Sequence, residues 1–421
     1  MQNPISVSAK LTKNLIAVAA AFTTCGVLSN TAVAAELEVT HWWTSGGEAA
    51  AVAEFAKAFD ATGNKWVDGA IAGAGGTAKP IIISRILGGD PMGATQLNHG
   101  QQAQELIEEG LLTDLTELAE KENWKDIVFP SSLLDACTVD GRIYCAPVNI
   151  HSAQWLWLSH AAFKEAGIDV PKNWGEFVAA APKLKEAGIQ PLAMGQQGWQ
   201  QNLAFGTITV AVAGMENWRE ASVNKNIDIA SGPQYKKVFE AVVEARELAK
   251  GSNVQDWNLA TNMVITNKAG GQIMGDWAQG EFQVAGQVAG EDYTCLPGLG
   301  VNEVLDTAGD AFYFPVIEDE ETKKAQLELA SLLVSPEVQV AFNLKKGSLP
   351  IRGDVDLATA NDCMQKGLQI LADGNVLPSS DMALSPDTLT QIEDLMAEFW
   401  SSDMSAEDAQ VNYASIIESS E

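Results

Sequence analysis

Residues 36–60 read ELEVTHWWTSGGEAAAVAEFAKAFD and join a strand pattern directly to a helix pattern. The first five residues alternate polar and apolar side chains, whereas residues 48–60 repeat apolar side chains at the helical period. Trp42 and Trp43 therefore lie on a loop between a strand and a helix. Ligands of open α/β sheets bind at the carboxyl ends of strands. A single tryptophan usually fills a core, but two adjacent ones on a polar, glycine-rich loop cannot both point inward, so the pair is a candidate binding surface.

The same alternation continues to about residue 120. We expect strands at 65–72 and 94–98, and helices through 80–87 and 102–110. This order predicts right-handed βαβ units and a mostly parallel sheet. Between a strand and a helix, "GAGGTAKP" (73–80) superficially resembles a phosphate loop. It lacks both the Lys-Ser/Thr ending and the G-x-G-x-x-G spacing, so we interpret it as a tight turn built from glycine.

The chain becomes richer in helices after residue 152, where a second α/β lobe begins. An extended crossing is expected at 306–316. Helices are expected at 160–167, 174–188 and 235–251, each closed by a glycine, and at 322–335 and 336–347. No low-complexity linker separates the two parts, so several short crossings must join them, and these could bend as a hinge.

The first 35 residues are typical of a secretory signal. Lys10 and Lys13 precede an apolar run at 15–28, and small residues allow cleavage near Ala34 or Ala35. A lipoprotein anchor at Cys25 is the alternative, but the residues before it lack the usual aliphatic side chain. No later run of 18 or more apolar residues follows. The mature chain is therefore expected in the periplasm.

The mature chain is strongly acidic. Without the two lysines of residues 1–35 it carries 24 basic and 55 acidic residues, a net charge of −31. Nucleic acids and anionic membrane surfaces are therefore poor partners. Arginine usually grips anionic ligands through two parallel hydrogen bonds, and the whole sequence holds five arginines: Arg85, Arg142, Arg219, Arg246 and Arg352. This scarcity favours a neutral ligand.

Four cysteines remain in the mature chain, and an even number in an oxidising compartment suggests disulfides with three possible pairings. Cys137 and Cys145 flank the hairpin signal Asp140-Gly141, so a bridge between two strands is reasonable there. Cys295 with Cys363 then follows by elimination. The cysteine spacing matches no zinc pattern, and the histidines are scattered, so we expect no metal site. The histidines are His41, His99, His151 and His160.

Aromatic, acidic and amide side chains recur at expected loop positions. They are Trp42, Trp43, Glu48, Gln96, Asn98, Trp199, Trp257, Asp276, Trp277, Asp310 and Lys346. Singly, each has an ordinary structural explanation as core filler, helix cap or solvated helix end. Together they suit a sugar, because a pyranose has apolar faces that stack on indole and hydroxyls that bond to carboxylates, amides and Lys.

The mature chain, residues 36–421, closely resembles the extracellular solute-binding proteins of bacterial ABC sugar importers, in the glucose/mannose-type branch. The resemblance rests on "HWWTSGGE", "AGAGGTAKP", "SRILGGDPMGATQ", "APVNIHSAQWLWLS", "IMGDWAQGEF", "GDAFYFP" and "FNLKKGSLPIR". It implies an α/β fold, the two-lobed periplasmic-binding-protein clamp (Venus flytrap), with each lobe a mixed sheet flanked by helices. It also implies a monomer that needs no cofactor, catalyses no reaction, binds a glucose-like neutral monosaccharide and delivers it to the membrane subunits of a permease.

From the resemblance we expect lobe 1 to comprise 36–147 with about 309–352, and lobe 2 to comprise 148–308 with about 353–421. Hinge crossings are expected near 147–150, 308–312 and 350–354. The resemblance places Trp42 or Trp43 with Glu48 on the first wall, and Gln96 and Asn98 on sugar hydroxyls. On the facing side Trp257 and Trp277 would stack on the sugar or close the pocket. Asp310 would bind hydroxyls near the hinge, and Lys346 would donate to one.

Two positions depart from this branch. Relatives carry His where this chain has Asn98, and His in a late loop where this chain reads "DMALSP", which places Asp381 there. These departures put glucose itself in doubt. A secreted carbohydrate-cleaving enzyme is the alternative from another class, with Glu48 and either Asp276 or Asp310 as its carboxylate pair.

Overall fold

The computed structural model describes residues 35–420, so the predicted signal sequence lies, apart from Ala35, outside the described part. The first of two larger sheets has the order β2-β1-β3-β12-β6. Its strands are β1 (Glu36–His41), β2 (Lys65–Ala70), β3 (Ala94–Asn98), β6 (Cys145–Pro147) and β12 (Asp310–Tyr313). β1 is parallel to β2 and β3, whereas β12 is antiparallel to β3 and β6. All strands but β12 thus share one direction, which confirms the mostly parallel sheet.

The second larger sheet has the order β10-β7-β9-β8. Its strands are β7 (Trp155–Ser159), β8 (Gln190–Ala193), β9 (Ala269–Ile273) and β10 (Tyr293–Pro297). β7 runs against β9 and β10, while β8 is parallel to β9. Two short sheets pair β4 (Thr138–Val139) with β5 (Arg142–Ile143), and β11 (Leu305–Asp306) with β13 (Val376–Leu377).

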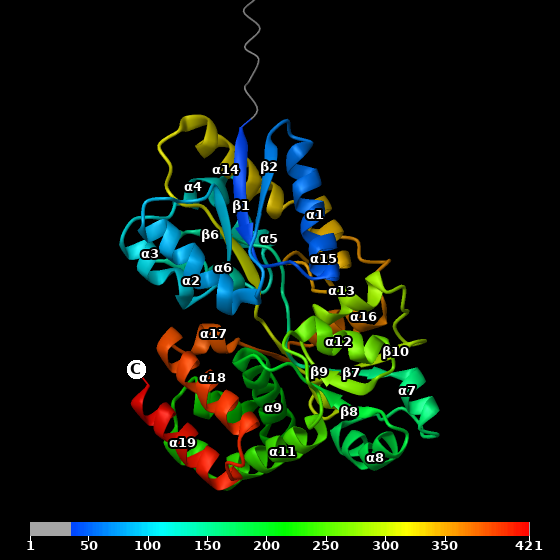
Figure 1. Ribbon diagram of the computed structural model, residues 1–421. Helices are drawn as coiled ribbons and strands as arrows, with labels where there is room; N and C mark the ends of the chain where they lie inside the picture. Colours follow the sequence, from blue (N-terminus) through cyan, green and yellow to red (C-terminus); the bar gives the residue numbers. More distant parts are fainter. Residues whose placement is uncertain (1–34, 421) are drawn as a thin grey trace, which may run out of the picture. The chain divides into compact units, whose positions relative to one another are not determined.

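Helices cover the faces of both sheets (Figure 1). Those packed near the first sheet include α1 (Gly46–Asp60), α2 (Ala74–Leu87), α3 (Gln104–Glu108), α4 (Thr116–Lys121), α5 (Trp124–Ile127), α6 (Ser132–Asp135), α14 (Glu320–Leu333) and α15 (Pro336–Lys346). The others are α7 (His160–Glu165), α8 (Trp174–Glu186), α9 (Gly198–Ser222), α10 (Ile227–Ala230), α11 (Pro233–Ala249), α12 (Trp257–Ile265), α13 (Ala278–Val284), α16 (Asp362–Ala372), α17 (Ser380–Ala383), α18 (Pro386–Ser401) and α19 (Ala406–Ser419). Single 3₁₀ turns occur at Gln101–Ala103 and Gly298–Gly300.

One local prediction was wrong. We expected a glycine turn at 73–80 and a helix only from residue 80, but α2 begins at Ala74 and includes Pro80. Gly73 and Ala74 make the turn, with φ of 104° and 59° in the left-handed region, which glycine adopts without strain. The following residues are therefore free to wind into helix, and this places Gly75 and Lys79 on the first turns of α2.

The strand pairings indicate where the chain passes from one larger sheet to the other, and so where the lobe boundaries lie. The chain leaves the first sheet after β6 and enters the second at β7, and it returns from β10 to β12. α15 then packs on α1, whereas α16 contacts β10. We therefore propose the division stated above, with lobe 1 at 36–147 and about 309–352, and lobe 2 at 148–308 and about 353–421.

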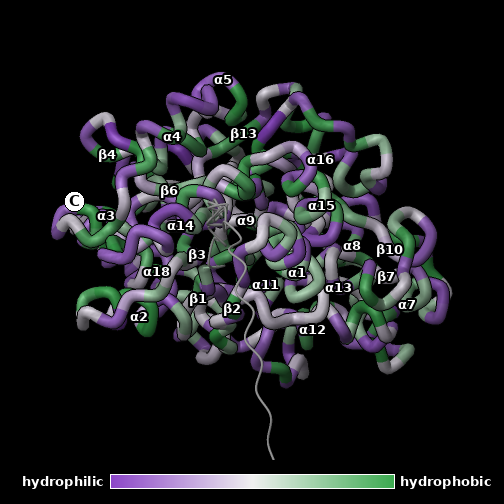
Figure 2. The backbone as a smooth tube through the Cα atoms, turned by 90° about the horizontal axis from the view of Figure 1, so that it is seen from above, coloured by the Kyte–Doolittle hydropathy of each residue, from purple (hydrophilic) through white to green (hydrophobic). Residues whose placement is uncertain are grey.

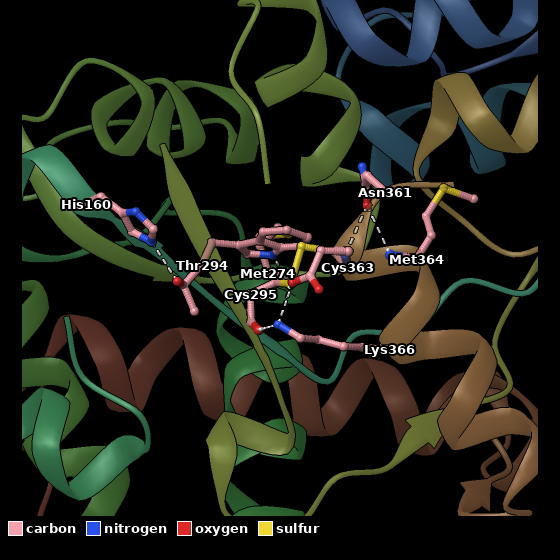
Figure 3. The surroundings of a disulfide bond; sticks show 10 residues. His160, Met274, Thr294, Cys295, Asn361, Cys363, Met364 and Lys366 are labelled. Carbon is pink, nitrogen blue, oxygen red and sulfur yellow. Dashed lines mark hydrogen bonds and ion pairs between the residues drawn. A yellow bond between two sulfur atoms is a disulfide. The ribbon is translucent and has the colours of Figure 1, made fainter. Parts of the chain in front are cut away.

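Both expected disulfide pairs are formed in the structure. Cys137 and Cys145 bracket the β4–β5 hairpin with their Cα atoms 5.1 Å apart. Cys295 on β10 is bonded to Cys363 on α16, with Cα atoms 6.0 Å apart, across 68 residues of chain. Figure 3 shows this second bond, where the Lys366 ammonium donates to the Cys295 carbonyl oxygen. The bridge thus fastens the chain that follows α15 to the second sheet.

Hydrophilic and hydrophobic segments alternate along the chain in Figure 2. Apolar side chains gather in the interior, where one cluster contains Trp43, Phe55, Phe312 and Phe342. Across residues 35–420 we find no helix with the length and apolar character needed to cross a membrane.

Candidate functional site

A cavity of about 290 Å³ is lined by Asn98 and Asp310 of the first sheet, by loops at the strand ends of both larger sheets, and by helices. Ten of the twelve residues expected at the site line it: Trp42, Trp43, Glu48, Asn98, Trp199, Trp257, Trp277, Asp310, Lys346 and Asp381. Trp42, Trp43 and Trp277 lie on loops after β1 and β9, Asn98 and Asp310 lie on β3 and β12, and the other five lie on helices. The spatial gathering of ten dispersed positions makes this cavity the candidate ligand site. In the described part of the chain, no cluster of histidine, cysteine and acidic side chains could hold a metal ion.

The two adjacent tryptophans divide their roles. Trp43 is 1% exposed and packs against Phe55, Phe312 and Phe342, with ring centroids 5.2 to 6.1 Å apart. Trp42 is half-buried at the cavity wall, and the Lys79 ammonium lies 5.7 Å from its ring centroid. Trp43 is therefore mainly a core residue, and Trp42 is the more exposed of the two at the cavity.

A second aromatic group lines the opposite wall. The ring of Trp277 lies 6.5 Å from Trp257, edge to face, and 6.4 Å from Trp199. The His151 ring centroid lies 5.0 Å from that of Trp277. A side chain at Gly275 would collide with the Trp277 ring, so the glycine is required for the ring to lie where it does. The wall is therefore a preformed apolar surface with polar edges.

A buried ion pair connects α1 with the end of α15. The Lys346 ammonium donates to the Glu48 carboxylate at 2.6 Å, and the two side chains are 2% and 9% exposed. Burial raises the pKa of Glu48, although the nearby Lys346 opposes this shift. The ammonium also lies 5.4 Å from the Trp43 ring centroid. The pair fixes both charged groups at the cavity wall.

Asp310 begins β12 and is 1% exposed. Its two carboxylate oxygens accept from the Gln96 amide at 2.6 Å and the Asn149 amide at 3.0 Å. Burial alone would raise the pKa of Asp310, but His151, Lys346 and the two amides more than offset it, so the pKa lies below its ordinary value. Asp310 is thus held ionised as a hydrogen-bond acceptor at the cavity.

Two expected site residues do not line this cavity. Gln96 is fully buried, where its amide donates to Asp310 and accepts from the Trp42 backbone N–H at 3.0 Å. It therefore positions two lining residues. Asp276 accepts from the Ser152 backbone N–H at 2.9 Å and lines a separate, much smaller cavity of about 10 Å³. Burial raises its pKa well above the ordinary value.

The two positions that depart from the family pattern contact each other. The Asn98 amide donates to one Asp381 oxygen at 2.8 Å, and the Gln102 amide donates to the other at 3.2 Å. Asn98 ends β3, whereas Asp381 lies on α17. The substitutions therefore form one amide–carboxylate pair that links the first sheet to the C-terminal segment beside the cavity.

Sequence reasoning missed several polar residues of the lining, among them Lys79, His151, Gln154, Asn202, Asp306 and Glu393. His151 and Gln154 lie in "APVNIHSAQWLWLS", whose position just after a sheet crossing was a usable signal. Lys79 was hidden because we read its segment as a turn. Glu393 lies on α18, and no sequence pattern connects that helix to strands nearly 300 residues earlier.

His99 gives a pH-dependent prediction. It is 1% exposed, neither ring nitrogen has a hydrogen-bond partner in the described residues, and burial lowers its pKa to about 4. Between pH 6.5 and pH 4 the unfolded state binds a proton that the folded state does not, so stability falls as the pH falls. His99→Gln should therefore remove about 2 kcal/mol of the stability loss between pH 7 and pH 5. Urea unfolding of both proteins at the two pH values measures this, and equal losses would contradict it.

Comparison with known proteins adds the family. The family described as bacterial extracellular solute-binding protein matches residues 43–340. A protein of Rhizobium meliloti named "Probable sugar-binding periplasmic protein" is 39% identical over 345 residues, covering 81% of this chain and 82% of the relative. The xylose/arabinose-binding protein XacG of Haloferax volcanii is 23% identical and covers 84% and 78%.

Solved structures share the fold. One is a bacterial solute receptor, AcbH, described as having an exclusive substrate preference for β-D-galactopyranose. It superimposes with a TM-score of 0.73 at 19% identity, covering 90% of this chain and 97% of the receptor. The fold class inferred from the sequence is thereby confirmed.

Proposed function

We propose that this chain, which belongs to the family of bacterial extracellular solute-binding proteins, binds a neutral hexose in its large cavity and delivers it to an ABC transporter. The observation that carries the proposal is the meeting of Trp42 on one wall and Trp277 on the other around fixed charged and amide groups. Relatives named for sugar binding support the same ligand class.

The side chains around the cavity suit both the apolar C–H faces and the hydroxyl groups of a pyranose. Indole rings offer surfaces for the apolar C–H faces, with aromatic stacking and burial supplying much of the binding energy. Asp310 accepts from hydroxyls, and Lys346 donates to them, through charge-assisted hydrogen bonds that strengthen when water leaves the cavity. Both groups are already held by protein partners, so little ordering is required on binding.

A neutral ligand suits the charges better than an anionic one. None of the five arginines of the sequence lines the cavity, whereas four carboxylates other than Asp310 do. They are Glu48, Asp306, Asp381 and Glu393. A carboxylate or phosphate on the ligand would meet these acids without a bidentate arginine to offset them.

The carbohydrate-cleaving alternative is disfavoured by the partners of its carboxylates. A general acid and base must both reach the scissile bond, and Asp276 lines a different cavity from Glu48. Asp310 does share the cavity with Glu48, but it is held by the Gln96 and Asn149 amides, and Glu48 is paired to Lys346. Membership of the family makes the chain a binding protein, not an enzyme.

A thermal-shift screen of the mature protein tests the proposal. A ligand that binds only the native state raises the melting temperature according to its concentration and Kd. We expect at least one of glucose, galactose and mannose to raise it, and hexuronates and amino acids to leave it unchanged. A shift with the charged compounds alone would contradict a neutral sugar as the ligand.

Asp381 is expected to set the choice among hexoses. An ionised carboxylate only accepts hydrogen bonds, whereas a histidine can donate and accept. Asp381→His should therefore change the preference among glucose, galactose and mannose by about tenfold or more, or 1.4 kcal/mol. Calorimetric titration with the three sugars measures this, with Asp387→His on the exposed start of α18 as control. Equal changes in affinity for all three sugars would show that Asp381 does not discriminate among them.

A further inference from the structure

The cavity continues beyond the polar residues into a helical compartment, which we define by Phe205, Gly206, Trp218, Ile392, Glu393 and Tyr413. These residues belong to α9, α18 and α19, which pack together in the lower part of Figure 1 although α9 lies far from the other two in the sequence. None of them belongs to the apolar cluster that holds Trp43 and Trp257. The cavity therefore reaches from the wall of the first sheet to the last helix.

The helical compartment is lined mainly by buried apolar side chains. Phe205, Trp218, Ile392 and Tyr413 are 2 to 8% exposed although they line open space. α9 is interrupted at Gly214, whose φ of 84° is non-helical, so Trp218 and Ser222 lie on a separately oriented segment. The polar groups that line the cavity from these helices are the Asn202 amide, the Ser222 and Tyr413 hydroxyls, the Trp218 indole nitrogen and the Glu393 carboxyl. Burial raises the pKa of Glu393 to about 7.

Gly206 leaves unfilled space within this compartment. It lies inside α9, and a Cβ atom added to it would meet no atom within 4 Å. Glycine in a helix interior costs about 1 kcal/mol relative to alanine. Here it adds room to the cavity at a position where the fold does not require the absence of a side chain.

We infer that the helical compartment receives an apolar group attached to the sugar, such as the aryl or alkyl aglycone of a glycoside. This inference rests on the proposed hexose site, to which the compartment is joined. A second sugar unit fits less well, because its ring of hydroxyls would face Phe205, Ile392 and the ring of Tyr413 with few partners, and unpaired buried hydroxyls are costly. An apolar group has no such requirement and gains by leaving water.

Calorimetric titration with free hexose and its 4-nitrophenyl glycosides, in both anomers, tests the inference. We use the hexose that binds, and the corresponding disaccharides for comparison. One aryl glycoside is expected to bind about tenfold or more tighter than the free hexose, the gain that burial of a phenyl ring provides. If neither anomer of the aryl glycoside bound, or if a disaccharide gained more affinity than the aryl glycosides, the inference would be overturned and the hexose site would remain. Failure of every sugar and glycoside to bind would overturn the proposed function as well.

The variant Gly206→Leu tests whether the higher affinity for the aryl glycoside arises in the helical compartment. A Cβ atom at this position meets no other atom within 4 Å, so we expect the leucine side chain to extend into the helical compartment. We expect it to lower affinity for the aryl glycoside by about tenfold or more and to leave affinity for the free hexose unchanged. Gly206→Ala, which adds a single carbon, is the matched control and should preserve most of the gain. Equal weakening of both ligands by Gly206→Leu would contradict the assignment.

Discussion

Replacing Lys346 by methionine is expected to lower the free energy of unfolding by about 3–5 kcal/mol. The substitution keeps the volume of the side chain but leaves the Glu48 carboxylate buried without its cationic partner, which lies 2.6 Å away in the structure. Desolvated charges that lose their partner are among the most destabilising changes a core can receive. Chemical unfolding of the ligand-free protein measures the loss.

Two further variants test whether the loss of stability comes from breaking the Glu48–Lys346 ion pair. Lys345→Met changes the neighbouring exposed lysine and should cost little. In the double variant Glu48→Gln with Lys346→Met, no charge is left unpaired, so much of the lost stability should return. If the double variant were as unstable as Lys346→Met alone, the ion pair would not be the cause of the loss.

Replacing Trp277 by alanine is expected to weaken hexose binding by about 2–4 kcal/mol, or roughly 30- to 1,000-fold. The ring contacts His151 and Trp257 on the cavity wall and packs against Gly275. Its removal takes away a stacking surface and widens the cavity, so water enters around the charged groups. Calorimetric titration of the folded variant gives the loss directly.

Trp400→Ala provides the comparison. Trp400 lies on α18 and packs on the apolar cluster of the second sheet, away from the cavity lining. Its removal should lower stability and leave hexose affinity unchanged. Equal losses of affinity in the two variants would mean that Trp277 has no direct contact with the ligand.

Much of the fold could be predicted because strands and helices differ in the period of their apolar side chains and because glycines mark several helix ends. The strand at 36–41 and the helix that follows were expected within two residues of their observed bounds, and glycines 167, 188 and 251 end helices with φ between 70° and 100° as expected. The start of α2 could not be predicted in the same way. The left-handed backbone of Gly73 and Ala74 sets this start, and the glycines at 75 and 76 make the segment resemble a loop in the sequence.

The candidate site, like the fold, could be predicted from the sequence only in part. Residues on loops that follow strands were found, because polar and aromatic side chains stand out there. The supporting role of Gln96 could not be read from the sequence, since both ends of its amide are taken by groups brought near only by folding. The contact between Asn98 and Asp381 joins positions 283 residues apart, and no local pattern reports such a pairing.

One titration tests the central claim most directly: calorimetry of the purified mature protein with glucose, galactose and mannose, followed in parallel by tryptophan fluorescence. We predict saturable binding of at least one hexose with a single site per chain, accompanied by a change in fluorescence because Trp42 and Trp277 line the cavity that the sugar fills. Absence of both heat and fluorescence change with all three sugars would contradict the claim that this cavity binds a neutral hexose.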